Sequence, residues 1–205
     1  MSAFFAWVAG SGIVQGLIMG LAFGYLTAVV VLNAVARSQT TTVNGWSSIR
    51  GAGQPGNGIV VRAALQKALP VVNVFEEAAY WTATRDAAGE LLRGAHTYCL
   101  HFPPGQLPPH SAFWSLTATD TAGYIVAGAS GRASVDSRAG LVPNADGSVD
   151  ILLQAYETVE LGTNWLPTPS GRFKLMLRAY LPGPAILDGS YQLPSVVERR
   201  PGTGS

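Results

Sequence analysis

The sequence predicts a mainly β protein, an antiparallel sandwich or barrel with one short helix, preceded by a single N-terminal transmembrane helix. Hydrophobic residues make up 48% of the 205 residues and charged residues only 12%, so the chain can build an apolar core. No charged side chain precedes Arg37. Beyond Arg37, short runs of alternating apolar and polar residues are divided by turn-forming residues, which is the pattern of half-buried strands.

Residues 1–37 form the predicted anchor. About 20 apolar residues cross the roughly 30 Å hydrocarbon layer of a bilayer, and we expect the spanning helix over residues 11–36. The alternative is a cleaved signal peptide, because Ala34-Val35-Ala36 resembles a cleavage site. The apolar stretch is too long for that, and no basic residue precedes it. The few basic residues that follow the helix favour a cytoplasmic C-terminal domain.

Residues 38–58, rich in Ser, Thr, Gly, Asn and Pro, are predicted to be a linker. A helix is predicted from Ile59 to Leu69, ended by Pro70. The residues spaced for its buried face are Ile59, Ala63, Leu65 and Ala68. We place the sandwich domain at residues 59–200 and a tail at 201–205.

Six alternating segments are predicted strands: Ala78–Thr84, His96–Phe102, Ala112–Thr119, Tyr124–Ala129, Val149–Ala155 and Phe173–Tyr180. Turn-forming sequences separate them: Asp86–Gly89, Pro103–Gly105, Asp120–Gly123, Asn144–Gly147 and Pro167–Gly171. The side chains expected to be largely buried include Trp114, Leu116, Leu175 and Leu177.

Composition excludes several function classes. The net charge of +1 leaves no basic footprint for nucleic acid. The single cysteine, Cys99, excludes an intrachain disulfide framework and multi-cysteine metal sites. The segment Gly51–Gly56 matches G-x-G-x-x-G, but Pro55 and the lack of a βαβ unit indicate a flexible loop rather than a dinucleotide site.

Catalytic chemistry is not evident, and no catalytic residue is assigned. Cys99 and His101 share one strand face while His96 points the opposite way, so a metal ion would need ligands from elsewhere. We expect no metal or cofactor, and a small buried cysteine beside a half-exposed histidine. Most aromatic rings should lie in the core, but a few could line an apolar cavity. The weak ligand-binding candidates are Tyr98, His101, Trp114 and Trp165.

The anchor carries small residues in register. Gly12, Gly16, Gly20 and Gly24 recur every four residues, and Ala28 continues the row. Positions four apart stay close to one helix face, and small residues let transmembrane helices pack closely. We therefore expect this face to pack on another transmembrane helix, either a second copy or another protein. Gln15, beside the row, could add an interhelical hydrogen bond.

Several ordered motifs resemble a known family. They are Tyr98, Pro108–Asp120, Gly123-Tyr124, Asn144–Ser148, Asn164–Pro167, Gly171–Tyr180 and Leu193–Glu198. Their residues and order are similar to the domain-of-unknown-function family 1214, over roughly residues 45–200. One departure is His110–Phe113, where the family commonly has a basic residue and a first tryptophan.

This resemblance implies a jelly-roll-like antiparallel β-sandwich, exported or membrane-tethered, often found with a companion domain, family 1254. It shifts the expected side of the domain to the periplasm, against the basic bias. We expect an inner-membrane binding or accessory protein that packs with a transmembrane partner, a family-1254 protein or its own copy. The alternatives are a hydrolase-type enzyme or a small apolar ligand-binding protein with its site in the sandwich mouth.

Overall fold

The computed structural model describes residues 7, 10–69, 73–125, 131–156 and 164–199. The chain divides into two compact units, residues 1–39 with 55–71 and residues 40–54 with 72–205, and we describe each by itself. The predicted helix end at Pro70, residues 126–129 of the predicted strand Tyr124–Ala129 and the tail 201–205 lie outside the described residues.

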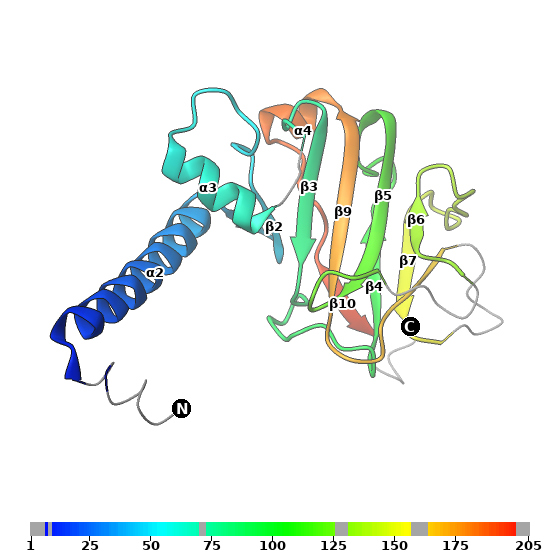
Figure 1. Ribbon diagram of the computed structural model, residues 1–205. Helices are drawn as coiled ribbons and strands as arrows, with labels where there is room; N and C mark the ends of the chain where they lie inside the picture. The colour runs from blue at the N-terminus through cyan, green and yellow to red at the C-terminus, as the bar shows by residue number, and fades with distance from the viewer. Residues whose placement is uncertain (1–6, 8–9, 70–72, 126–130, 157–163, 200–205) are drawn as a thin grey trace. The chain divides into compact units, whose positions relative to one another are not determined.

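The first unit consists of two helices, α2 (Gly12–Ser38) and α3 (Ile59–Ala68) (Figure 1). The Ser11 side chain caps α2 by accepting a hydrogen bond from the Val14 amide. Its 27 residues extend for about 40 Å at 1.5 Å per residue. By length and composition this helix could cross a membrane, as an anchor or as a signal sequence.

The helix α3 forms as predicted but buries a different face. Ala64 and Leu65 are its buried residues, whereas Ile59, Ala63 and Ala68 are exposed. Of the four residues predicted to be buried, only Leu65 is buried. The spacing of apolar residues could not identify the buried side, because the elements packed against a helix decide which of its apolar residues lose contact with solvent.

The second unit is a sandwich-like pair of sheets. One sheet has the strand order β1 (Thr41–Val43), β2 (Trp46–Ser48), β3 (Ala78–Ala83), β9 (Phe173–Pro182), β5 (His110–Asp120) and β6 (Ser134–Asp136), all antiparallel. The other has the order β10 (Val196–Arg199), β4 (Thr97–Phe102), β7 (Val149–Gln154) and β8 (Trp165–Pro167). Only the β7–β8 pair is parallel among the described strands. A short helix, α4 (Pro184–Asp188), follows β9.

The core lies between the two sheets and follows from the alternation along the strands. In β9, at the centre of the six-stranded sheet (Figure 1), Leu175 and Leu177 face inward, while the alternate residues Met176 and Arg178 are half-exposed. Trp114, Leu116, Leu175 and Leu177 are fully buried, which confirms that prediction. Successive strand residues point to opposite faces, so in β9 the sequence pattern and the burial pattern coincide.

Several predicted boundaries differ. The predicted linker 38–58 contains the hairpin β1–β2, because Asn44 and Gly45 both have positive φ, the geometry of a tight two-residue turn. Of the predicted strand Tyr124–Ala129, the described Tyr124 and Ile125 are exposed, and only an isolated bridge pairs Thr119 with Ile125. The short elements β6, β8, β10 and α4 were not predicted.

We predict that Leu177→Ala lowers the free energy of unfolding by about 2–5 kcal/mol, because it opens a cavity in a packed core. The matched control is Met176→Ala, one residue earlier on the same strand but on the half-exposed face. Urea unfolding of the full chain in detergent, at constant m value, measures both. Equal losses for the two variants would contradict the assigned inner face.

Candidate functional site

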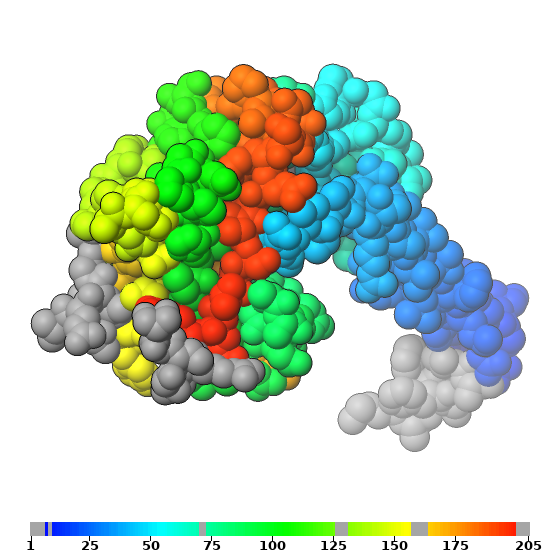
Figure 2. Space-filling view, turned by 180° about the vertical axis from the view of Figure 1, so that it is seen from behind, coloured from blue at the N-terminus to red at the C-terminus, as the bar shows by residue number. Residues whose placement is uncertain are grey.

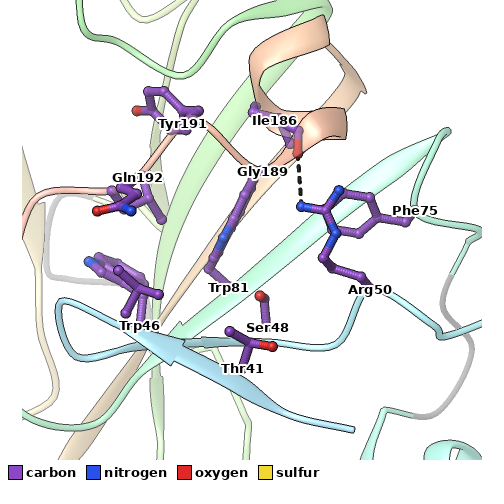
Figure 3. Close-up of a pocket in the computed structure, with 12 residues that line it drawn as sticks. Thr41, Trp46, Ser48, Arg50, Phe75, Trp81, Ile186, Gly189, Tyr191 and Gln192 are labelled. Carbon is purple, nitrogen blue, oxygen red and sulfur yellow. Dashed lines mark hydrogen bonds between the residues drawn. The ribbon is translucent and has the colours of Figure 1, made fainter.

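A pocket lies on the inner face of the six-stranded sheet, at its β1–β2 edge. Its volume is about 100 Å³. The sheet contributes side chains that the strand register places on one face, since Thr41 pairs with Ser48, Ser48 with Trp81 and Val43 with Trp46. Its lining residues are Thr41, Val43, Trp46, Ser48, Arg50, Phe75, Trp81, Ile186, Gly189, Tyr191, Gln192 and Leu193 (Figure 3).

The hairpin β1–β2 is joined to the C-terminal segment by two hydrogen bonds. Asn44, in the turn, donates from Nδ2 to the Leu193 carbonyl at 2.9 Å. Trp46 donates from Nε1 to the Pro194 carbonyl at 2.8 Å. In Figure 2 the C-terminal segment, orange to red, runs beside the blue residues of this hairpin. Segments about 150 positions apart in the chain therefore lie side by side and both line the pocket.

Arg50 forms a second wall together with the end of α4. Its guanidinium donates to the carbonyls of Ile186 and Leu187 in the last turn of that helix, where a cation is favoured by the helix dipole. It also lies 4.6 Å from the centre of the Phe75 ring (Figure 3). Gly189 permits this approach, because a Cβ there would lie 3.1 Å from Arg50 Nη1 and its φ is +87°.

Tyr191 closes the pocket on the α4 side. Its amide donates to the Ala185 carbonyl at 2.8 Å, and its hydroxyl donates to the Gln106 carbonyl at 3.0 Å. Burial raises the pKa of the Tyr191 hydroxyl above its ordinary value. The phenol therefore stays neutral at physiological pH and acts as a fixed, largely apolar wall.

The lining is aromatic and lacks the usual acid–base groups. Trp46, Trp81, Phe75 and Tyr191 supply large rings, with Phe75 edge-on to Trp81 at 6.5 Å. The twelve lining residues include no His, Cys, Asp or Glu. Within this pocket, Ser48 therefore has no side chain of the kind that serves as its general base. Aromatic rings and the polar side chains of Thr41, Ser48, Arg50 and Gln192 thus share the lining.

The four predicted ligand-binding residues do not converge on this pocket. Tyr98 and Trp114 are buried in the core, where Tyr98 is edge-on to Phe173 and Trp114 lies 6.1 Å from Phe102. Trp165, on β8, is buried and donates from Nε1 to the Gln154 carbonyl. His101 is exposed on the opposite, outer face of the four-stranded sheet.

His101 belongs to a polar row on that outer face. Its Nδ1 donates to Asp150 Oδ1 at 2.6 Å, across the β4–β7 pair. Partial burial raises the pKa of Asp150, but the hydrogen bonds with His101 and Asn144 and the charge of His101 outweigh it. The net pKa is below the ordinary value of 3.8. The pair thus joins two strands by a charge-assisted hydrogen bond.

Cys99 lies on the same outer face and is half-buried, so the prediction of a buried cysteine is wrong. Its position in β4 is one residue from the inward-facing Tyr98 and Leu100, and the strand alternation turns it outward. Burial raises the pKa of the thiol to about 12, and the Asp150 carboxylate adds to the rise. The thiol is therefore protonated at neutral pH and is a weak nucleophile. No group of three or more His, Cys, Asp or Glu in the described residues could hold a metal ion.

Two further sequence motifs have a definite place. The segment Gly51–Gly56 follows β2, a strand paired antiparallel on both sides, and so lies outside any βαβ unit. The glycine row of α2 is exposed. A Cβ added to any of its four glycines would meet nothing within 4 Å. The other two residues predicted for this face, Gln15 and Ala28, lie on the same helix, and Ala28 is exposed.

The linker predicted for residues 38–58 leaves out the hairpin residues that line the pocket. Asn-Gly between short β-forming segments is a strong hairpin signal, and Asn44-Gly45 lies between Thr41–Val43 and Trp46–Ser48. That signal predicts a shared face for Val43 and Trp46. The contributions of α4 and residues 189–193 have no such local signal.

Comparisons with known proteins give a family and a fold. Residues 77–184 match the family model described as protein of unknown function (DUF1214). The crystal structure of the VPA0106 protein from Vibrio parahaemolyticus is 26% identical, with a TM-score of 0.59, covering 69% of this chain and 35% of that one. That of an uncharacterized protein from Burkholderia cenocepacia is 16% identical, with a TM-score of 0.40, covering 96% and 46%. This chain therefore spans less than half of either protein. No curated protein matches it.

We predict that acid lowers the stability of the parent more than that of Asp150→Asn. A carboxyl whose folded pKa is depressed stabilises the fold above its ordinary pKa of 3.8, and this contribution is lost as the pH falls through the folded pKa. Urea unfolding between pH 5 and pH 2 measures the loss. His101→Gln should reduce the loss in the same way, and the double variant should reduce it no further. Unchanged acid sensitivity in both single variants would contradict the assignment.

Proposed function

The chain belongs to the DUF1214 family of proteins of unknown function, and from that premise we propose that it is a membrane-anchored binding or accessory protein. Its apolar helix α2 would hold it in the cell membrane, and its sandwich would bind a small apolar group in the pocket at the β1–β2 edge. The observation that carries the proposal is the aromatic pocket at the β1–β2 edge.

The size and lining of the pocket indicate what it would bind. Pockets for whole drug-sized ligands measure about 300–1,000 Å³, and this one is about 100 Å³. It therefore suits one small ring or a short alkyl group, either a small molecule or the end of a larger one. The rings of Trp46, Trp81 and Tyr191 would contact its faces, and the hydroxyls of Thr41 and Ser48 would offer polar contacts at the sheet edge.

The anchor and its orientation complete the proposal. Helix α2 is long and apolar enough to span the bilayer, and Arg37 lies in its last turn, where headgroups would meet it. We infer an inner-membrane protein with its sandwich in the periplasm, supported by the resemblance to tethered family members. The weak basic bias after α2 favours the cytoplasmic side instead.

We further propose that the glycine face of α2 packs on a second transmembrane helix. Lipid offers little hydrophobic drive for helices to associate, and small residues supply close contact instead. A Cβ added at Gly12, Gly16, Gly20 or Gly24 would meet nothing within 4 Å, although Gly24 also borders the groove that Val60 of α3 lines. The partner would be a second copy or a companion membrane protein, for which a family-1254 protein is one candidate.

We predict that Ser48→Leu fills the pocket and abolishes binding of small apolar probes. Saturation-transfer NMR with phenol, cyclohexanol and n-butanol on the full chain in detergent measures the binding. Ser47→Leu is the matched control, because Ser47 is adjacent in β2 but faces outward, where its hydroxyl contacts that of Thr42 at 2.8 Å. If the parent binds none of the probes, or if Ser48→Leu binds them equally well, the pocket is not a binding site.

We also predict that the double variant Gly16→Ile and Gly20→Ile loses its partner while inserting normally, because branched side chains prevent close helix contact. Co-purification after gentle detergent solubilisation and crosslinking measure the association. The control is Ala22→Ile, about 200° around the helix from Gly20 and likewise exposed. Association of the double variant as tight as the parent's would show that the glycine face is no interface.

A further inference from the structure

We propose that α3 is a membrane-surface helix, with Ile59 and Val60 among lipid acyl chains and Arg62 and Lys67 among anionic headgroups. This inference rests on the proposed anchoring through α2 and adds a second lipid contact to it. The partner is the bilayer itself, recognised by its combination of an apolar layer and a negatively charged surface.

The charge of this part of the chain has one sign only. No Asp or Glu precedes Glu76 in the sequence. Within the first unit the charged side chains are Arg37 at the end of α2 and Arg62 and Lys67 on α3. Basic side chains next to a transmembrane helix are attracted to anionic lipid headgroups. Three cations without a carboxylate to neutralise them match such a surface.

Contacts within the first unit show which part of α2 lies beside each end of α3. Lys67 Nζ donates to Asn33 Oδ1 at 2.9 Å, which holds the C-terminal turn of α3 beside Asn33. Val60, in the first turn of α3, instead lines an apolar groove with α2 residues Phe23, Gly24, Thr27, Ala28, Val31 and Leu32. Because these residues all precede Asn33, the first turn of α3 lies further from Arg37 than its last turn does.

The length of α2 gives the depth in the bilayer at which each turn of α3 would lie. A hydrocarbon layer of roughly 30 Å takes about 20 helical residues, which the stretch from Gly12 to Leu32 provides. Asn33 and Arg37 then lie in the headgroup layer. Ala28 lies about 6 Å inside Leu32, at 1.5 Å per residue. Val60 therefore lies in the outermost part of the acyl layer, the depth of about 5–10 Å that interfacial helices reach.

The exposure of α3 agrees with that depth. Ile59 is 77% exposed and Val60 is 46% exposed, although both are large apolar residues at the start of the helix. The neighbouring surface of α2 is also exposed and apolar, with no buried residue. The groove between them, of about 430 Å³, is lined by apolar side chains and Thr27. Acyl chains would cover this groove and the exposed first turn of α3, while Gly12, Gly16 and Gly20 lie outside the groove.

The test uses the full chain in vesicles of phosphatidylcholine and phosphatidylglycerol. Cys99→Ser removes the sole cysteine, and a single NBD fluorophore is then attached at Ile59→Cys. Reference probes are attached at Ala22→Cys in α2 and at Ala122→Cys, which is exposed in a turn of the sandwich. Spin-labelled lipids carrying the quencher near the headgroup or deep in the acyl chain report the depth of each probe.

We expect the Ile59 probe to be quenched several-fold more than the Ala122 probe, and best by the shallow quencher, with the Ala22 probe quenched best by the deep one. If the Ala22 probe is deep and the Ile59 probe behaves like the Ala122 probe, α3 does not bind lipid, although the anchor stands. If the Ala22 probe is not quenched, both the anchor and the inference are wrong.

A charge variant tests the headgroup contact separately. Arg62→Gln should weaken quenching of the Ile59 probe, and the difference from the parent should disappear in vesicles of phosphatidylcholine alone. The matched control is Arg172→Gln, an exposed arginine of the sandwich, which should change nothing. Equal effects of the two variants, or no effect of phosphatidylglycerol on the parent, would contradict recognition of anionic lipid.

Discussion

The six-stranded sheet presents a wider inner face than a four-stranded sheet can cover, and the arrangement of the sandwich depends on this mismatch. Strand β8 lies against β6 and β5 at one end of the pair of sheets. The opposite end, at β1 and β2, must be covered by other segments. Helix α4 and the segment leading to β10 cover it, with Ile186 and Leu193 buried in the same core as Trp46 and Phe75. A pocket remains where this irregular cover meets the regular sheet.

The residues around that pocket are held by contacts that have little to do with a ligand. Arg50 satisfies carbonyls at the end of α4, Trp46 and Asn44 satisfy carbonyls of the C-terminal segment, and Tyr191 donates to the Gln106 carbonyl. Buried polar backbone groups need such partners. The side chains that line the pocket are thus already ordered before a ligand binds. Binding therefore loses less conformational entropy. On the outer face of the other sheet, His101 is engaged with the Asp150 carboxylate of the neighbouring strand, and His96, just before β4, is engaged with Glu198.

The first unit obeys a different constraint. It has a long apolar helix, a short helix with an exposed apolar first turn, and positive charges only. In water the exposed apolar surface of α2 and α3 would be unfavourable, while in a bilayer the same surface is solvated and the cations meet headgroups. The bilayer that we propose, apolar inside and negative at its edge, would account for both helices. The sandwich needs no such environment, because its apolar residues face one another.

The sequence alone determined the apolar helix, the long strands and the family. Alternation in Phe173–Tyr180 identifies the inward side chains of β9 without knowledge of the fold, since strand periodicity is a property of the backbone. In β5 the polar residues Ser115, Thr117 and Thr119 are buried as well, which alternation does not predict. The turns could also be predicted from neighbouring residues alone. At Asp86–Gly89 and Asp120–Gly123 the aspartate carboxylate accepts hydrogen bonds from backbone amides of the same turn, and the glycine has positive φ. Tertiary structure decided the rest. The strands β6, β8 and β10 are three or four residues long and exist because longer strands pair with them, and the pocket joins residues 41–50 to residues 186–193. The identity of the aromatic rings that line a cavity depends on which segment covers the sheet edge, and that is a long-range contact which no local pattern encodes.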